Sequence, residues 1–240
     1  MLRTVHTTRY VTPLREGGSL PALIEASDDG MYVLKLRGAG QGPRALVAEL
    51  IAGELARVLG LPIPELVFAH LSPAFGHAEP DREISDLLSA SAGLNVALDF
   101  LPGALPFHAL LGPGLDPALA SAVVWFDAFV SNVDRTAKNP NLLMWHDRLW
   151  LIDHGAALYV HHGWSVGGDP ARDATSRFPL IKDHVLLPFA STLHHADAFA
   201  VIRRGMLDVA ILGGLQVDVM GDLANWIVPG ERVHGIGGGL

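Results

Sequence analysis

The chain has 240 residues, which allows one domain or two small ones. Half of them are hydrophobic and 18% are charged, which indicates a globular rather than a disordered protein. It contains no cysteine, so disulfides and thiolate metal sites are excluded, as suits a cytoplasmic protein. The formal net charge of −8 argues against a nucleic-acid-binding surface, and no signal-peptide core or 18-residue apolar run predicts membrane contact.

The N-terminal part of the chain has the pattern of β-strands. Residues 1–30 alternate between apolar and polar side chains, with breaks at Gly17-Gly18 and at Asp28-Asp29-Gly30, where we expect a hairpin turn. Residues 31–37 then alternate strictly, which places Lys35 on the face opposite the apolar one. The apolar face of this strand consists of Tyr32, Leu34 and Leu36.

A helix is predicted over residues 44–59. It follows the flexible glycine loop 38–42, Pro43 can occupy its first turn, and Gly60 ends it. Glu49 lies beside its predicted apolar stripe. That stripe consists of Val47, Leu50, Ile51, Leu55 and Val58.

Two further strands and a second helix are predicted beyond this point. Strands at 65–71 and 95–101 enclose a polar segment, 72–93, which we expect to be loop with one short helix. Asp116 and Pro117 supply the N-cap and first turn of a helix over 118–131. The predicted fold class is therefore α+β. Its predicted domains are a small β-rich lobe at 1–101, a helical lobe at 102–193 and a glycine-rich tail at 194–240.

The stretch from Val130 to Gly155 has the strongest functional pattern. Two short apolar runs flank a polar turn at His146-Asp147-Arg148, which predicts a β-hairpin. Such a hairpin brings the Asn139–Asn141 end opposite Asp153, with Asp134 close by. Carboxylate and amide oxygens suit Mg²⁺, which commonly accompanies nucleotide phosphates. The order of Asp, Asn and Asp-x-Gly is that of a phosphotransfer site.

Each of these residues also has a simpler interpretation. Asp134 is a candidate base or orienter for a hydroxyl, although a lone aspartate is more often a turn residue. Asn139 is the candidate metal ligand, and Asn141 is its rival because simple register places it closer to Asp153. Arg135 and Lys138 could bind phosphate or close an ion pair on the loop.

The upstream pair Lys35 and Glu49 supports the same chemistry. A lysine can act as a point charge on nucleotide phosphates, and a glutamate on the following helix can hold it in place. The alternative is a surface lysine and an unrelated surface glutamate. Histidines 154, 161 and 162 form no H-x-x-x-H or HExxH pattern, so we do not expect a transition-metal site.

With these motifs in this order, residues 5–193 resemble the HipA-like kinase family. The most specific parts of the match are DRTAKNPN at 134–141 and LIDHGAA at 151–157. The resemblance implies a two-lobed protein-kinase-like fold and transfer of phosphate from ATP to a Ser or Thr hydroxyl of a protein. The roles that it implies are Lys35 on the ATP phosphates, Glu49 as its partner, Asp134 as catalytic aspartate, Asn139 and Asp153 on Mg²⁺, and the backbone of Asp99, Phe100 and Leu101 on adenine.

The C-terminal segment has a different likeness. Residues 196–240 resemble part of the B subunit of 3-oxoacid (succinyl-CoA type) CoA-transferases, with ILGGLQV at 211–217 and LANWIVPG at 223–230 as the specific runs. In that family the nucleophile is a glutamate in a Glu-Asn-Gly context, which this chain lacks. We therefore interpret the segment as a non-catalytic appendage from a gene fusion or frameshift, and expect it to dock poorly. CoA transfer and nucleotide binding without turnover are the alternative functions.

Overall fold

The computed structural model describes residues 2–14, 20–39, 42–159, 179–191, 216–217 and 223–224. The chain divides into two compact units, of which the first comprises residues 1–165 and 178–190 and the second comprises 166–177 and 191–240. In the second unit, the short strand β9 (Gln216–Val217) pairs antiparallel with β10 (Leu223–Ala224). Apart from these two strands, the tail that we expect to dock poorly lies outside the described residues.

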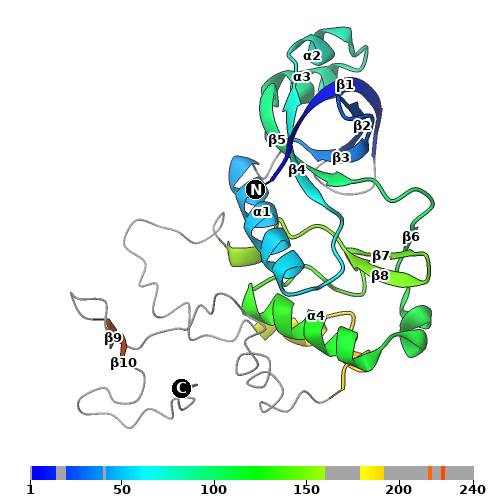
Figure 1. Cartoon of the computed structure of the whole chain (residues 1–240), viewed down its shortest axis with the longest axis vertical. Coiled ribbons are helices and arrows are strands. Elements are labelled where there is room, and N and C mark those ends of the chain that lie inside the picture. The colour runs from blue at the N-terminus through cyan, green and yellow to red at the C-terminus, as the bar shows by residue number, and fades with distance from the viewer. Residues whose placement is uncertain are drawn as a thin grey trace. The chain divides into compact units, whose positions relative to one another are not determined.

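A closed five-stranded barrel forms one end of the first unit (Figure 1). Its strands follow the order β1-β2-β3-β5-β4, and it closes through parallel pairing of β1 with β4. The other neighbours are antiparallel. The strands are β1 (Thr4–Pro13), β2 (Ala22–Ala26), β3 (Met31–Lys35), β4 (Leu66–Leu71) and β5 (Gly93–Asp99).

The alternation predicted around Lys35 is confirmed. In β3, Tyr32 and Leu34 are buried inside the barrel, whereas Val33 and Lys35 are only partly buried. Successive side chains of a strand point to opposite faces, so the barrel wall turns Lys35 outward. The strand ends at Lys35 rather than at Arg37.

The helix α1 (Gly42–Val58) forms as predicted, but three of the five residues of its predicted apolar stripe do not face the core, whereas Leu55 packs against it. Val47, Ile51 and Val58 are each about half exposed. The buried face is built from small residues and Glu49, and consists of Ala45, Ala48, Glu49, Ala52, Gly53 and Ala56. The stripe prediction is wrong at the three exposed positions because the close approach of α1 to the barrel uses small residues: a Cβ at Gly53 would lie 2.5 Å from Cδ1 of Leu66.

The segment between β4 and β5 contains two helices, where the sequence predicted loop and one. They are α2 (Ala74–Ala78) and α3 (Arg82–Ala90), which lie together at the end of the barrel in Figure 1. Asp81 caps α3 by accepting from the backbone N–H groups of Glu83 and Ile84. Apolar side chains of α3 then complete the barrel core.

The rest of the first unit combines a small sheet with helices. The three-stranded sheet has the order β6 (Leu105–Pro106), β7 (Leu142–Trp145) and β8 (Arg148–Leu151). The helix α4 (Pro117–Phe129) begins at its predicted cap, Asp116. Four 3-10 turns complete the described part of the unit, and they are η1 (Ala109–Gly114), η2 (Ala157–Tyr159), η3 (Pro179–Asp183) and η4 (Leu187–Phe189).

The predicted hairpin is confirmed as β7 and β8. Trp145 pairs with Arg148, so the loop is only His146 and Asp147, and Arg148 is already in the strand. Both loop residues have positive φ, 48° and 58°, as a type I′ turn requires. This tight turn fixes the register and therefore the residues that meet at the open end.

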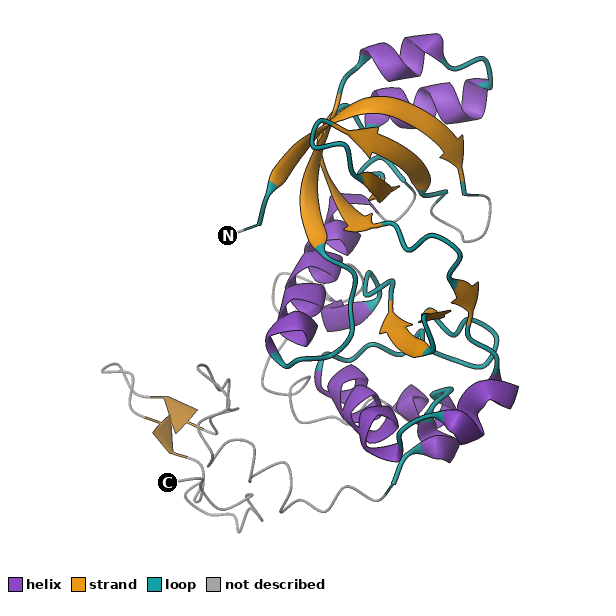
Figure 2. Ribbon diagram, turned by 45° about the vertical axis from the view of Figure 1, so that its right-hand side comes forward, coloured by secondary structure: helices purple, strands orange, loops and turns teal. Residues whose placement is uncertain are grey.

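The helix α1 lies between the barrel and α4 (Figure 2), and its residues join the hydrophobic core on both sides. Leu46 packs with Leu66 and Val96 of the barrel, whereas Ala52 and Ala56 pack in the cluster that contains Phe126 of α4. The fold is thus a mixed α+β arrangement with few helices, as predicted at the level of class. Across the described residues, no helix has the length and apolar character needed to cross a membrane.

Candidate functional site

A cleft of about 800 Å³ lies in the first unit, between one end of the barrel and the β7–β8 hairpin. Seven predicted site residues line it: Lys35, Asp99, Phe100, Leu101, Asp134, Asn139 and Asp153. The eighth, Glu49, is fully buried behind it on α1. Apolar walls come from Val33, Leu98, Leu142, Leu143 and Ile152. Residues from three separate stretches of sequence are therefore brought to one cavity.

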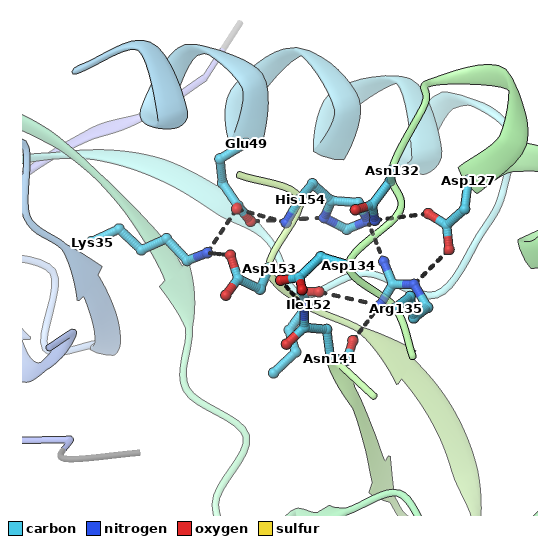
Figure 3. Close-up of polar contacts among 10 residues, drawn as sticks. All are labelled: Lys35, Glu49, Asp127, Asn132, Asp134, Arg135, Asn141, Ile152, Asp153 and His154. Carbon is cyan, nitrogen blue, oxygen red and sulfur yellow. Dashed lines mark hydrogen bonds and ion pairs between the residues drawn. The ribbon is translucent and has the colours of Figure 1, made fainter. Parts of the chain in front are cut away.

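An ion-pair triad stands at the inner end of this cleft. Lys35 Nζ donates to Glu49 Oε2 at 2.7 Å and to Asp153 Oδ1 at 2.5 Å (Figure 3). The second contact joins residues 118 positions apart in the sequence. The Lys35 side chain is 14% exposed and that of Asp153 is 43% exposed, so the triad runs from the interior to the open cleft.

Burial and mutual charge control the protonation of this triad. Burial would raise the pKa of Glu49, but Lys35 and the side chain of His154 outweigh it and hold the value at about 2. The backbone N–H of His154 also donates to Glu49 Oε2 at 2.7 Å. Burial would likewise lower the pKa of Lys35, but Glu49 and Asp153 together raise it. The lysine is therefore cationic and the glutamate anionic at neutral pH.

The backbone at Asp153 adopts an unusual conformation. Its φ is 57°, in the left-handed region that residues other than glycine adopt uncommonly. Ile152, just before it, still donates its N–H to the carbonyl of Asn141 at 3.1 Å, which continues the β7–β8 ladder. The chain turns away directly after this bond, and the turn directs the Asp153 carboxylate toward Lys35.

Asp134 accepts hydrogen bonds from Asn139 and Asn141, the two alternative candidates for the metal ligand. Its Oδ2 accepts from Nδ2 of Asn139 at 2.8 Å and from Nδ2 of Asn141 at 3.3 Å. The loop between them is closed by Thr136, whose N–H donates to the carbonyls of Asp134 and Asn139. Because both amide nitrogens face Asp134, both amide oxygens remain available to another group.

The segment that follows β5 offers few backbone groups to a ligand. The N–H of Phe100 donates to the carbonyl of Met31 at 3.0 Å, and the carbonyl of Leu101 accepts from Ala104 at 3.1 Å. Both groups are therefore committed to the fold. Outside the strand ladders, the carbonyl of Asp99 and the N–H of Leu101 have no backbone partner among the described residues.

The donor set fits Mg²⁺ better than a transition metal. It consists of the second carboxylate oxygen of Asp153 and the amide oxygens of Asn139 and Asn141, all hard oxygen ligands. Throughout the described ranges, no three His, Asp or Glu side chains form a metal-binding group. His161 and His162 lie outside those ranges.

The sequence left open whether Arg135 and Lys138 bind phosphate or form an ion pair, and the structure separates the two residues. Lys138 is exposed, whereas Arg135 has no exposed surface and forms an ion pair with Asp127 of α4, Nε to Oδ2 at 2.6 Å. Arg135 therefore closes an ion pair and cannot reach a phosphate in the cleft. Burial would raise the pKa of Asp127, but Arg135 and a hydrogen bond from His184 bring it to about 2.

The network around Asp127 was not found by sequence reasoning. Asn132 donates to Asp127 Oδ1 at 3.0 Å, and His184 Nε2 lies 2.9 Å from Oδ2. The backbone N–H of Leu186 points at His184 Nδ1, so the ring proton is on Nε2 and is donated to Asp127. An acidic residue within the apolar run VVWFDAF was the available signal, because a buried carboxylate needs partners.

Comparison with known proteins finds two likenesses. A family model described as HipA-like kinase matches residues 8–162. The chain also resembles bacterial CoA-transferase polypeptides, each over a short span. The B subunit of the succinyl-CoA:3-ketoacid coenzyme A transferase of Helicobacter pylori is 49% identical over 55 residues, which are 23% of this chain and 27% of that protein.

Two further relatives show the same limited coverage. The beta subunit of the acetate CoA-transferase of Escherichia coli is 51% identical over 55 residues, 23% of this chain and 26% of the relative. The beta subunit of a probable coenzyme A transferase of Bacillus subtilis is 58% identical over 51 residues, 21% and 24% respectively. The chain thus spans about a quarter of the length of these curated relatives. The resemblance of residues 196–240 to a CoA-transferase agrees with these matches.

Proposed function

The chain belongs to the HipA-like kinase family, and on that basis we propose that it is an ATP- and Mg²⁺-dependent kinase that phosphorylates Ser or Thr of a protein. The observation that carries the proposal is the triad of Lys35, Glu49 and Asp153 at the inner end of the cleft. Such a lysine–glutamate pair beside an Asp-x-Gly aspartate is the arrangement that phosphoryl transfer uses. The proposed division is a nucleotide-binding lobe, 1–101, and a catalytic lobe, 102–193, with 194–240 appended.

Each site residue has a defined task in this proposal. Lys35 neutralises charge on the ATP phosphates, and Glu49 keeps the ammonium in place. Asp153 and Asn139 or Asn141 hold Mg²⁺, which when bound offsets charge on the γ-phosphoryl group. The carbonyl of Asp99 and the N–H of Leu101 meet the adenine edge, while the apolar walls contact its faces.

Asp134 orients the acceptor hydroxyl. The hydroxyl oxygen forms a bond to the γ-phosphorus as the bond to the bridging oxygen breaks, ADP leaves, and the hydroxyl proton passes to Asp134. Asn139 and Asn141 engage only one of its carboxylate oxygens, so Oδ1 is the atom that faces the acceptor. We place the reaction in the cytoplasm, with a protein as partner.

The test is transfer of labelled γ-phosphate from ATP to the protein itself or to a general protein substrate. We expect D134A to reduce transfer roughly 10²–10⁴-fold, as loss of a catalytic base does. We expect D153A to reduce transfer about 100-fold or more, because mutation of residues that only hydrogen-bond to metal ligands already lowers metal affinity or activity ~10–100-fold. D86A, which removes an exposed aspartate of α3, is the matched control. Full activity in both site variants would refute the assignment.

CoA transfer is the second candidate, favoured by the similarity of residues 196–240. It requires a glutamate nucleophile from elsewhere, because the chain contains no Glu-Asn-Gly. Incubation with acetoacetyl-CoA and succinate separates the two: measurable exchange of CoA would replace the kinase proposal. Nucleotide binding without any transfer would instead identify an inactive binding module.

A further inference from the structure

Arg135 is a buried charge next to the candidate catalytic aspartate. It is among the largest fully buried side chains in the described part of the chain. A buried guanidinium is costly unless it is paired and all its donors are used. Asp127 supplies the charge, and the remaining donors go to neither solvent nor the cleft.

Those donors reach both chain segments at the open end of the β7–β8 hairpin. Nη1 donates to the carbonyl of Asn141, which directly precedes β7, and to the carbonyl of Ile152, which directly follows β8, at 3.2 Å. Nη2 lies 3.3 Å from Nε2 of His154. Asp153 therefore lies between two residues that the same guanidinium contacts (Figure 3).

The guanidinium is also fixed from behind. Asp127 accepts from Arg135 and His184 on one oxygen and from Asn132 on the other. The backbone of Arg135 is tied as well, because its carbonyl accepts from the N–H of Val185 at 3.0 Å. The planar fork thus has little freedom to turn, and it transmits a fixed geometry to its two carbonyl acceptors.

We propose that Arg135 is a positioning residue that sets the separation of Asn141 and Asp153, and so couples Mg²⁺ to nucleotide binding. This inference rests on the proposed function. Arg135 touches neither the nucleotide nor the metal in this scheme. It orients the groups that do, as outer residues of metal sites do for the ligands.

The experiment measures the affinity of the full-length chain for a non-hydrolysable ATP analogue with Mg²⁺ and with EDTA. The dissociation constant in EDTA divided by that in Mg²⁺ reports how strongly Mg²⁺ enhances nucleotide binding, and this ratio is the Mg²⁺ coupling. R135K keeps the charge beside Asp127 but cannot donate as a planar fork to two carbonyls. We expect the ratio to fall about 10- to 100-fold in R135K, with affinity in EDTA unchanged because Lys35 and the apolar walls are intact.

N95A is the matched control, because it also removes a buried side chain that makes several hydrogen bonds. Asn95 is 2% exposed and bridges the N–H of Arg37 and the carbonyls of Ser91 and Gly93, away from the cleft. Its loss should lower the melting temperature and leave the Mg²⁺ ratio as in the wild type. A purely structural Arg135 would behave in the same way.

A second variant covers the case in which R135K does not fold. D127N preserves the shape of the partner but removes its charge, so it loosens the guanidinium without deleting it, and it should also lower the ratio. An unchanged ratio in R135K, or in D127N where R135K is unfolded, would overturn the inference. A wild-type protein that binds the analogue no better with Mg²⁺ would instead refute the proposed function.

Discussion

Glu49 shows how strongly one residue can depend on its surroundings. Its carboxylate is fully buried, and Oε2 accepts both from Lys35 and from the backbone N–H of His154. His154 Nε2 faces an Arg135 donor, so the ring proton is on Nδ1, 3.7 Å from Glu49 Oε1. The anion thus receives hydrogen bonds from a strand and a loop on Oε2, while Oε1 faces the His154 ring without a hydrogen bond from any described residue.

This environment predicts a pH-dependent contribution to stability. The pKa of Glu49 falls from 4.5 to about 2 on folding, so the unfolded chain binds more protons between these values. The stabilisation is complete above pH ~4.5 and is lost as the pH falls toward 2; it is on the order of 3 kcal/mol. We expect E49Q to be less stable at pH 7 and to lose less stability on acidification.

Urea unfolding at several pH values between 7 and 2 measures this difference. E83Q removes an exposed glutamate from the first turn of α3 and is the matched control for a change of net charge. Parallel stability curves for E49Q and the wild type over this range would contradict the prediction.

At the scale of elements, the orientation of α1 depends on how closely its backbone can approach the barrel, and not only on where its large apolar residues lie. It carries Glu49 to the cleft while packing on the barrel and on the cluster around Phe126. Small residues contribute to both contacts beside Leu46 and Leu55, and at Gly53 even one added carbon would meet the Leu66 and Ile63 side chains. Large apolar residues such as Ile51 are left on the outer face, half exposed.

Two neighbouring positions of α1 test this arrangement. I51A removes a large residue that is half exposed, so we expect a change in unfolding free energy within about 0.5 kcal/mol. A52L inserts bulk where the side chain has no exposed surface, and should destabilise by about 1–3 kcal/mol. Denaturant unfolding of both variants gives the comparison.

The stripe read from the sequence predicts the opposite order. In that case Ile51 would face the core and its truncation would be the costly change. A larger loss for I51A than for A52L would therefore show that the outer face of α1 is covered in solution.

At the scale of the whole molecule, the first unit holds every candidate site residue. We expect Mg²⁺ and ATP together to stabilise it, because a ligand that binds only the folded state shifts unfolding by mass action. At about 100 times the dissociation constant the gain is about 2.7 kcal/mol, or roughly 5–10 °C in melting temperature. Thermal unfolding with ATP, with Mg²⁺ and with both measures it.

D153N is the informative variant in this experiment. It removes the charge of the proposed metal ligand while nearly preserving its shape, so ATP should still stabilise the protein but addition of Mg²⁺ should add nothing. An equal Mg²⁺-dependent shift in D153N and wild type would show that the metal does not bind through Asp153.

The sequence by itself determined the local pieces and their order. Alternation placed the Lys35 side chain on the outer face of its strand, Asp116 and Pro117 predicted the start of α4, and the apolar runs predicted the hairpin. Each of these features depends on neighbouring residues alone. It could not show that Arg135 is buried, that α1 buries its small face, or that Lys35 contacts Asp153, 118 residues away. Those features depend on which surfaces meet when the barrel, α1 and the hairpin pack together. The periodicity of a segment shows which of its faces is apolar, but not which other segment that face contacts.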